Sequence, residues 1–193
     1  MEDDTLDRDA RIKLSIGTKE EGDADGLFSG PSSLVFDHHR GLLLVADTWN
    51  CRVQLFSCDD GSFVSKFGEK GDQPGQFQHP WGLAIDYDHD RIFIVDYGNN
   101  RVQSWSLSEQ SFVSCVGQRG SGDLEFGDPR RVAIDKHHNR IIITDTDNNR
   151  LVFLSSIDLS FLFSVGKRGS RPGEFYSPSG IAVDDDRHRI IVT

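Results

Sequence analysis

The sequence has few cysteines, and it lacks both a secretory signal and any long apolar run. Its three cysteines occupy unrelated positions, which gives neither a disulfide framework nor a metal-ligand spacing and fits a reducing compartment. The first residues are acidic, with no basic segment leading into an apolar core. No stretch approaches the roughly 18–20 apolar residues of a membrane span. We therefore expect a cytoplasmic protein that does not associate with membranes.

Basic residues are also scarce, because 21 Lys and Arg stand against 31 Asp and Glu, a net charge of −10. That balance argues against indiscriminate nucleic-acid binding. The sequence has no glycine-rich phosphate loop, no Gly-x-Ser-x-Gly motif and no His-Glu-x-x-His motif. We accordingly expect no cofactor and no metal site.

What the sequence does contain is an internal repeat with a period of 49 residues. Prolines recur at that step, as do phenylalanines and aspartates. These residues are Pro31, Pro80, Pro129 and Pro178; Phe28, Phe77, Phe126 and Phe175; Asp37, Asp86, Asp135 and Asp184. A fixed period in this range indicates a repeat architecture.

Each unit holds four short runs rich in Ile, Val, Phe and Trp, bounded by Gly, Asn, Asp and Pro. In the second unit they span 82–86, 91–96, 101–106 and 111–117. The loops between them are short, which favours antiparallel neighbours. No segment shows the spacing of a long amphipathic helix. Four antiparallel strands in each repeated unit are typical of propeller blades.

The repeated motif Pro-x-Gly-Ile/Leu-Ala-Ile/Val-Asp, followed by Ile-x-Val-x-Asp-x-x-Asn-x-Arg-Val and Phe-x-x-x-Phe/Val-Gly-x-x-Gly, resembles the NHL repeat over residues 28–193. The resemblance implies a β-propeller, commonly six-bladed. The sequence departs from the pattern in places. Cys51 follows the hairpin asparagine, and Ser33 and Arg131 replace the glycine found at Gly82 and Gly180.

We therefore predict an all-β propeller of four-stranded antiparallel blades, with three complete blades and a partial blade at each end. The predicted divisions are an acidic disordered segment 1–10, an outer strand and loop 11–27, complete blades 28–76, 77–125 and 126–174, and a partial blade 175–193.

Three and a half blades do not easily close a ring, since propellers typically have 4–8 blades. The sequence leaves three arrangements open. The chain is part of a longer protein, or it closes as an incomplete four-bladed ring, or it pairs with a second copy. Because open blade edges seek partners, self-association through them is one expectation.

A triplet Asp-x-x-Asn-x-Arg recurs in every complete unit, across a predicted tight turn. The Asp and Arg can pair there, and the Asn can cap the turn. Since no unit differs from the others, we interpret the triplet as a structural hairpin element without a catalytic role. Its members are Asp47, Asn50 and Arg52; Asp96, Asn99 and Arg101; Asp145, Asn148 and Arg150.

Residues that vary against this constant framework are better candidates for a binding face. In propeller topology they fall on the face formed by the inter-blade loops and the second hairpins. They are Trp49, His79, Trp81, Tyr97, Arg119, Arg130, Arg131, Lys167, Arg168, Arg171 and Tyr176. Aromatic residues interleaved with Arg suit protein partners, and they also suit stacking on single-stranded RNA bases.

We therefore predict a non-catalytic binding or scaffold module that recognises a protein partner through its loop face. The NHL resemblance implies that such a module can be the substrate-recognition part of a ubiquitin ligase. Sequence-selective RNA binding on the same face is the first alternative. An enzyme of the propeller lyase or lactonase type is the second, although metal-dependent members would need several convergent ligands and His79 stands alone near the predicted axis.

Overall fold

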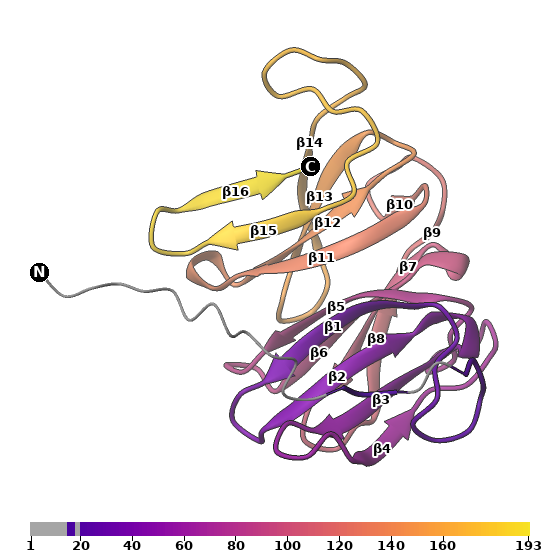
Figure 1. The fold of residues 1–193 in the computed structure, drawn as a ribbon. Helices are drawn as coiled ribbons and strands as arrows, with labels where there is room; N and C mark the ends of the chain where they lie inside the picture. The colour runs from indigo at the N-terminus through magenta and orange to yellow at the C-terminus, as the bar shows by residue number, and fades with distance from the viewer. Residues whose placement is uncertain (1–14, 18–19) are drawn as a thin grey trace, which may run out of the picture.

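The computed structural model describes residues 15–17 and 20–193, and β-strands dominate it (Figure 1). The predicted disordered segment 1–10 lies outside the described residues, as does most of the outer strand predicted within 11–27. The described strands form three four-stranded antiparallel sheets, one two-stranded antiparallel sheet and one short parallel pair. We call the first three sheets blades 1, 2 and 3.

Each blade runs in simple up-and-down order. Blade 1 contains β1 (Pro31–Asp37), β2 (Leu42–Asp47), β3 (Arg52–Ser57) and β4 (Phe63–Phe67). Blade 2 contains β5 (Pro80–Asp86), β6 (Arg91–Asp96), β7 (Arg101–Ser106) and β8 (Phe112–Val116). Blade 3 contains β11 (Pro129–Asp135), β12 (Arg140–Asp145), β13 (Arg150–Ser155) and β14 (Phe161–Val165). The last sheet pairs β15 (Ile181–Asp184) with β16 (Arg189–Val192).

Short elements lie in the hairpins and in the loops between the sheets. Three 3-10 turns lie in the hairpins: η1 (Thr48–Asn50), η2 (Tyr97–Asn99) and η3 (Lys136–His138). The inter-blade loop after blade 2 carries a short parallel pair, β9 (Gln118–Arg119) with β10 (Glu125–Phe126). Parallel bridges Lys70–Phe77 and Arg168–Phe175 hold the corresponding loops elsewhere in the repeat.

The innermost strands begin earlier than the sequence predicted, because each contains a bulge. In β5, Pro80 pairs with Asp96 and Leu83 pairs with Ile94, so Trp81 and Gly82 fall in a register irregularity. The same irregularity in β11 holds Arg130 and Arg131. A bulge redirects the side chains that it contains. These are the positions at which the sequence varies from blade to blade.

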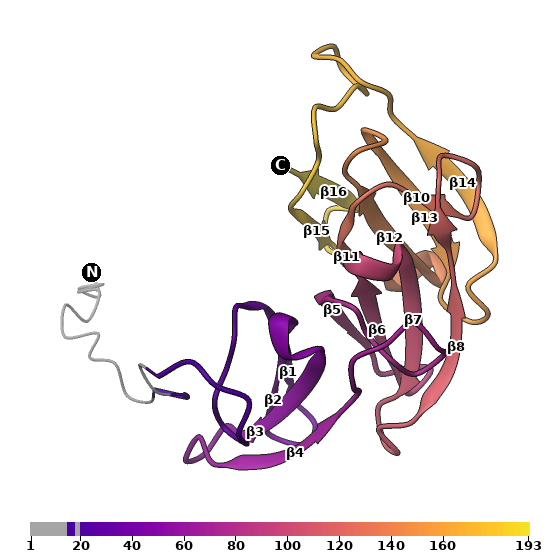
Figure 2. The same ribbon diagram turned by 90° about the vertical axis from the view of Figure 1, so that its right-hand side faces the viewer.

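The hydrophobic core lies between the blades, and it requires strands that are apolar on both faces. Successive side chains along a strand point to opposite faces. In β6, Ile92 and Ile94 pack toward blade 1, and Phe93 and Val95 pack toward blade 3. Sheet contacts therefore run from β1 to β5, from β5 to β11 and from β11 to β15. The sheets form an open arc, with blade 1 at one end and β15–β16 at the other (Figures 1 and 2).

A buried hydrogen-bond network holds the second hairpin of every blade. Arg101 Nε donates to Asp96 Oδ2 at 2.9 Å, and Asn99 donates to the same oxygen at 2.8 Å. Arg101 also donates to the carbonyls of Asp72, Gln73 and Gln76 in the preceding loop. Asp96 is fully buried. We refer to such a set as the hairpin network of its blade.

The other two blades repeat this network. Arg52 Nε to Asp47 and Arg150 Nε to Asp145 each measure 2.7 Å. Each arginine again donates to three carbonyls of the loop before its blade. Because each arginine side chain joins the aspartate of its hairpin to backbone carbonyls of the preceding loop, the network holds the hairpin against that loop.

Candidate binding face

A row of four aromatic rings crosses the end of blades 1 and 2 on the face formed by the second hairpins. Trp49 meets His79 edge-on, with ring centroids 4.8 Å apart. His79 lies 6.2 Å from Tyr97, and Tyr97 lies 5.4 Å from Trp81. Trp49 is 56% exposed, and the other three rings are half-buried. We call these four residues the aromatic row.

The hairpin networks position the row. Trp49 lies in η1 and Tyr97 in η2, directly after the buried aspartates Asp47 and Asp96. Asp96 Oδ1 also accepts the backbone N–H of His79 at 3.3 Å. The backbone that carries three of the rings is therefore tied to carboxylates in the protein interior.

Gly30 makes room for Trp49. A Cβ atom at that glycine would lie 1.9 Å from Trp49 Cδ1, and the residue has a φ of +56°. Side chains rarely adopt that conformation, and here the indole also occupies the space. The indole of Trp49 is thus seated against the backbone of the chain and retains one open side.

A polar cavity of about 280 Å³ adjoins the row at Tyr97. Its lining includes Asn100, Arg119, Asp128 and Asp147. A hydrogen bond to Asp128 is the main cause that raises the pKa of the Tyr97 hydroxyl, with burial second. The hydroxyl therefore stays protonated and able to donate near neutral pH.

Arg130 links the cavity to the row. Its guanidinium pairs with Asp128 at 3.0 Å and lies 5.9 Å from the centre of the Trp81 ring. Asp128 was not among the residues predicted for the face, although its repeat position carries Gly30, His79 and Ser177 in the other units. The variation at this repeat position could have identified Asp128, whose side chain forms a hydrogen bond with Tyr97 of blade 2.

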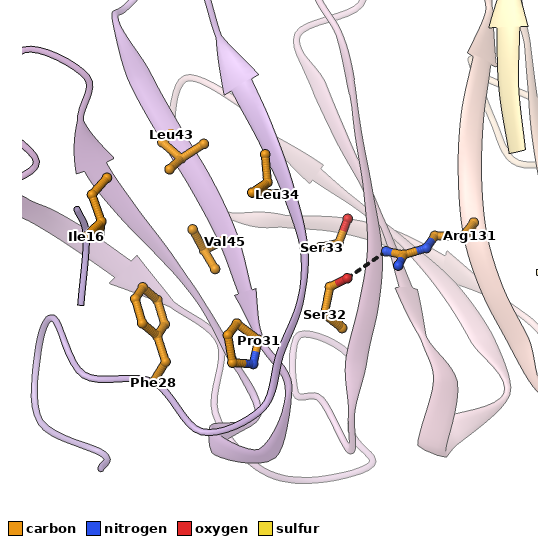
Figure 3. A pocket seen from close by; sticks show the side chains of 9 residues that line it. All are labelled: Ile16, Phe28, Pro31, Ser32, Ser33, Leu34, Leu43, Val45 and Arg131. Carbon is orange, nitrogen blue, oxygen red and sulfur yellow. Dashed lines mark hydrogen bonds between the residues drawn. The ribbon is translucent and has the colours of Figure 1, made fainter. Parts of the chain in front are cut away.

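The side chain of Arg131 extends from blade 3 to blade 1. Its Nη1 donates to the carbonyl of Ser32 at 2.8 Å, which connects blade 3 to blade 1 (Figure 3). Burial, and secondarily the charge of Arg130, lowers the pKa of its guanidinium. Arg131 lines a separate cavity of about 550 Å³, beside Ser33 and Leu34.

The remaining basic candidates form a second group, in the loop between β14 and β15. Arg168 lies 5.1 Å from the centre of the Tyr176 ring, and Lys167 pairs with Glu174 at 3.4 Å. Arg171 is exposed in the same loop. Within residues 15–17 and 20–193, no hydrogen bond, ion pair or ring contact joins this loop to the aromatic row. The structure therefore separates the predicted face into two regions.

His79 should make the stability of the folded protein depend on pH. Burial lowers the pKa of His79 from its ordinary value of 6.5, outweighing the opposing effect of Asp96. The folded protein therefore favours the neutral ring, and the unfolded chain binds more protons as the pH falls through 6.5. We expect the free energy of unfolding to decrease with falling pH in the window just below 6.5.

Urea unfolding at several pH values, for the wild type and for His79→Gln, would measure this contribution. The variant should lose that part of the pH dependence, and the NMR titration of the His79 ring should have its midpoint below 6.5. A midpoint above 6.5 would contradict the assignment of burial as the dominant influence.

The described part of the chain holds no cluster of three or more His, Cys, Asp or Glu side chains arranged for a metal ion. None of its helices is long and apolar enough to span a membrane.

The sheets define the class of protein as a β-propeller. More narrowly, the chain belongs to the family described as 6-bladed beta-propeller (DUF5128), whose model matches residues 23–121 and 120–193. No match to the sequence was found among curated proteins.

Solved structures show the same fold at low sequence identity. Hydrazine synthase from Kuenenia stuttgartiensis superposes with a TM-score of 0.67 at 10% identity, over 91% of this chain and 44% of that one. Dihydro-heme d1 dehydrogenase NirN gives 0.59 at 16% identity, over 84% and 32%. Glutaminyl cyclase from Myxococcus xanthus gives 0.57 at 12% identity, over 84% and 67%. Two of these three matches thus span less than half of the other chain, and the likeness concerns the fold alone.

Proposed function

We propose that this chain is a non-catalytic propeller module that binds a protein partner through the aromatic row and the adjoining polar cavity. The observation that carries the proposal is the set of four rings from blades 1 and 2, held by buried hairpin networks and open to solvent at Trp49. Aromatic side chains on a rigid surface provide large contact areas at low entropic cost, which is why they dominate binding hot spots.

The polar cavity supplies orientation beside that apolar surface. Its exposed groups include Asp147 and Arg119, which carry opposite charges. A bound segment would place an apolar side chain against Trp49 and a polar group near Tyr97. Such a combination of an aromatic anchor with a few convergent polar groups is typical of recognition sites.

The finer predictions differ in their support. We propose that the repeats are of the NHL type, on the strength of the motif that recurs every 49 residues. A role in substrate recognition for a ubiquitin ligase would belong to the whole protein, and it stays a prediction. We also propose a cytoplasmic location, supported by free cysteines at positions 51, 58 and 115.

Among the described residues, no specific observation supports either of the two alternative functions. For RNA binding, Arg130 and Arg131 of the predicted face would contact phosphate, but the first pairs with Asp128 and the second donates to the carbonyl of Ser32. Each would have to leave its present partner to contact phosphate. The enzyme alternative would require chemical groups converging on one point, and His79 contacts aromatic rings on both sides.

Selection of peptides from a phage-displayed library on the immobilised 193-residue chain would test the proposal. Selected peptides should bind the wild type and lose at least tenfold in affinity for Trp49→Ala and for Tyr97→Ala. The expected loss follows from the cost of truncating an anchor residue, about 2 kcal/mol or more.

Val113→Ala provides the matched control, since this exposed side chain lies on the outer strand β8. It should leave peptide affinity unchanged. Peptides that bind the Trp49 and Tyr97 variants as tightly as the wild type would refute the proposed face.

A further inference from the structure

The aromatic row carries hydrogen-bond donors as well as apolar ring faces. The indole N–H groups of Trp49 and Trp81 have no acceptor within residues 15–17 and 20–193. Trp49 is 56% exposed, and the nitrogen of Trp81 is not one of the buried atoms that lack a partner. Neither donor is therefore committed to the fold, and a ligand on the row can supply its acceptor.

Blade 2 departs from the repeat at the residue that forms the centre of the row. Blades 1 and 3 have Thr48 and Thr146 at this position, and each hydroxyl donates to the carbonyl of the proline that begins the next blade, at 2.8 Å. Tyr97 stands there in blade 2, with its ring in the row and its hydroxyl bonded to Asp128. The residue that ties two blades together elsewhere thus adds to the binding surface here.

This combination of rings and donors fits an extended ligand with free carbonyl groups. A helical ligand uses most of its carbonyls in its own hydrogen bonds. A ligand that adds as a β-strand needs the main-chain groups of a sheet edge. Trp49 and Tyr97 lie in 3-10 turns, and His79 precedes β5, so three of the four rings lie outside the strands. A polyproline II helix has no internal hydrogen bonds, and its proline rings are apolar.

The spacing of the row suits the same conformation. Successive rings along it have centroids 4.8, 6.2 and 5.4 Å apart. A polyproline II helix rises about 3.1 Å per residue, so two residues advance by about 6 Å. Residues at alternate positions of such a segment can therefore meet successive rings. Because the helix is already formed in the free peptide, little conformational entropy is lost on a rigid surface.

The charges beside the row indicate the character of a neighbouring residue in the ligand. Three charged groups act on the Tyr97 hydroxyl, namely Asp128, Arg130 and Asp147. The first two pair with each other at 3.0 Å. Asp147 is exposed and has no ion-pair partner among the described residues. Since the whole chain also carries a net charge of −10, a basic segment is attracted at long range as well.

We propose that the segment recognised by the aromatic row is a polyproline II helix with a basic residue placed next to Asp147. Prolines pack on the rings, the indole N–H of Trp81 donates to a carbonyl between them, and the basic side chain pairs with the free carboxylate. This inference rests on the proposed function, because it names the class of partner for the same site.

Isothermal titration calorimetry with three synthetic peptides would test the proposal on the 193-residue chain. The first peptide is a run of prolines followed by two arginines. The second has two glutamates in place of the arginines, and the third has alternating glycine and serine in place of the prolines. The first should bind about tenfold more tightly than the third, because a flexible chain loses more entropy on binding. Equal affinities for these two would overturn the proposal.

The glutamate peptide tests the sign of the charge. It should bind more weakly than the arginine peptide, and Asp147→Asn should remove that difference while it lowers affinity for the arginine peptide by about twofold to fivefold. Arg119 lines the same cavity and would favour the glutamate peptide. Tighter binding of the glutamate peptide would therefore overturn the pairing with Asp147.

Trp81→Phe separates the hydrogen bond from the stacking, because it retains an aromatic ring and removes the N–H group. Affinity for the arginine peptide should fall by about twofold to tenfold, the usual range for one neutral hydrogen bond. Val113→Ala, on the outer strand β8, is the matched control and should bind like the wild type. Unchanged affinity for Trp81→Phe would overturn the assigned donor, and circular dichroism confirms that each variant is folded.

The peptides selected by phage display distinguish this inference from the proposed function. Peptides that depend on Trp49 and Tyr97 should contain closely spaced prolines and a lysine or arginine. Selected peptides that depend on both residues but lack proline would overturn the polyproline II assignment and leave the proposed function standing. Selected peptides that bind both alanine variants as tightly as the wild type would overturn the proposed function and this inference together.

Discussion

Replacing Asp96 with alanine should lower the free energy of unfolding by about 3–5 kcal/mol, the usual cost of removing one partner from a buried ion pair. Asp96 is fully buried and accepts hydrogen bonds from the side chains of Arg101, Asn99 and Gln103. Without the carboxylate, the guanidinium of Arg101 stays in the interior with only carbonyl partners. The backbone N–H of His79 would also lose its acceptor.

Urea unfolding followed by circular dichroism would measure this loss. Asp147→Ala is the matched control, because this aspartate lies in the corresponding hairpin of blade 3 but is exposed, and it should change stability by no more than about 0.5 kcal/mol. A second variant, Asp96→Leu with Arg101→Met, should recover part of the loss, since removing both charges avoids the unpaired one. A cost below about 1 kcal/mol for Asp96→Ala would show that the network is not a stabilising element.

Gly82→Val should be the second most damaging change, with an expected loss of about 3 kcal/mol, at the upper end of the usual range for overpacking. A Cβ atom at Gly82 would lie 2.5 Å from the carbonyl oxygen of Arg130 and 2.9 Å from the Cα of Arg131. The obstacle is backbone, so no side-chain rotation can relieve it. The innermost strands β5 and β11 would have to separate.

The separation should also weaken the candidate site, because β5 carries Trp81 and β11 carries Arg130. Peptides selected on the wild type should therefore bind Gly82→Val less tightly even at temperatures where the variant is folded. Ser33→Ala, at the same repeat position in blade 1, is the matched control and should have little effect on either quantity. Thermal unfolding of Gly82→Val at the wild-type midpoint would contradict the close approach of these strands.

The repeat made the fold predictable from sequence. Strands 91–96 and 101–106 were placed at their observed ends, because the hairpin aspartate and arginine mark the turn in every unit. The start of β5 was placed two residues late. A bulge at Trp81 and Gly82 breaks the alternation of apolar residues, and sequence patterning has no signal for where pairing resumes beyond it.

The candidate site was predictable in its residue types but not in its contacts. The sequence indicated that Trp49, His79, Trp81 and Tyr97 vary on a constant framework, and the structure brings those four together. It could not indicate that Arg131 turns toward Ser32, because that contact joins residues 99 positions apart through a bulge. Side-chain direction inside a bulge depends on the neighbouring blades, which a period does not describe.

The hairpin networks bear on how the chain folds during its synthesis. Arg52, Arg101 and Arg150 each reach back to carbonyls that lie 25–29 residues earlier in the chain. All of those acceptors have been made before the arginine itself emerges from the ribosome. Each blade can therefore form its hydrogen bonds to the preceding loop before the next blade has been synthesised. The blades can then fold one after another in the order of synthesis, through contacts that are short in sequence separation.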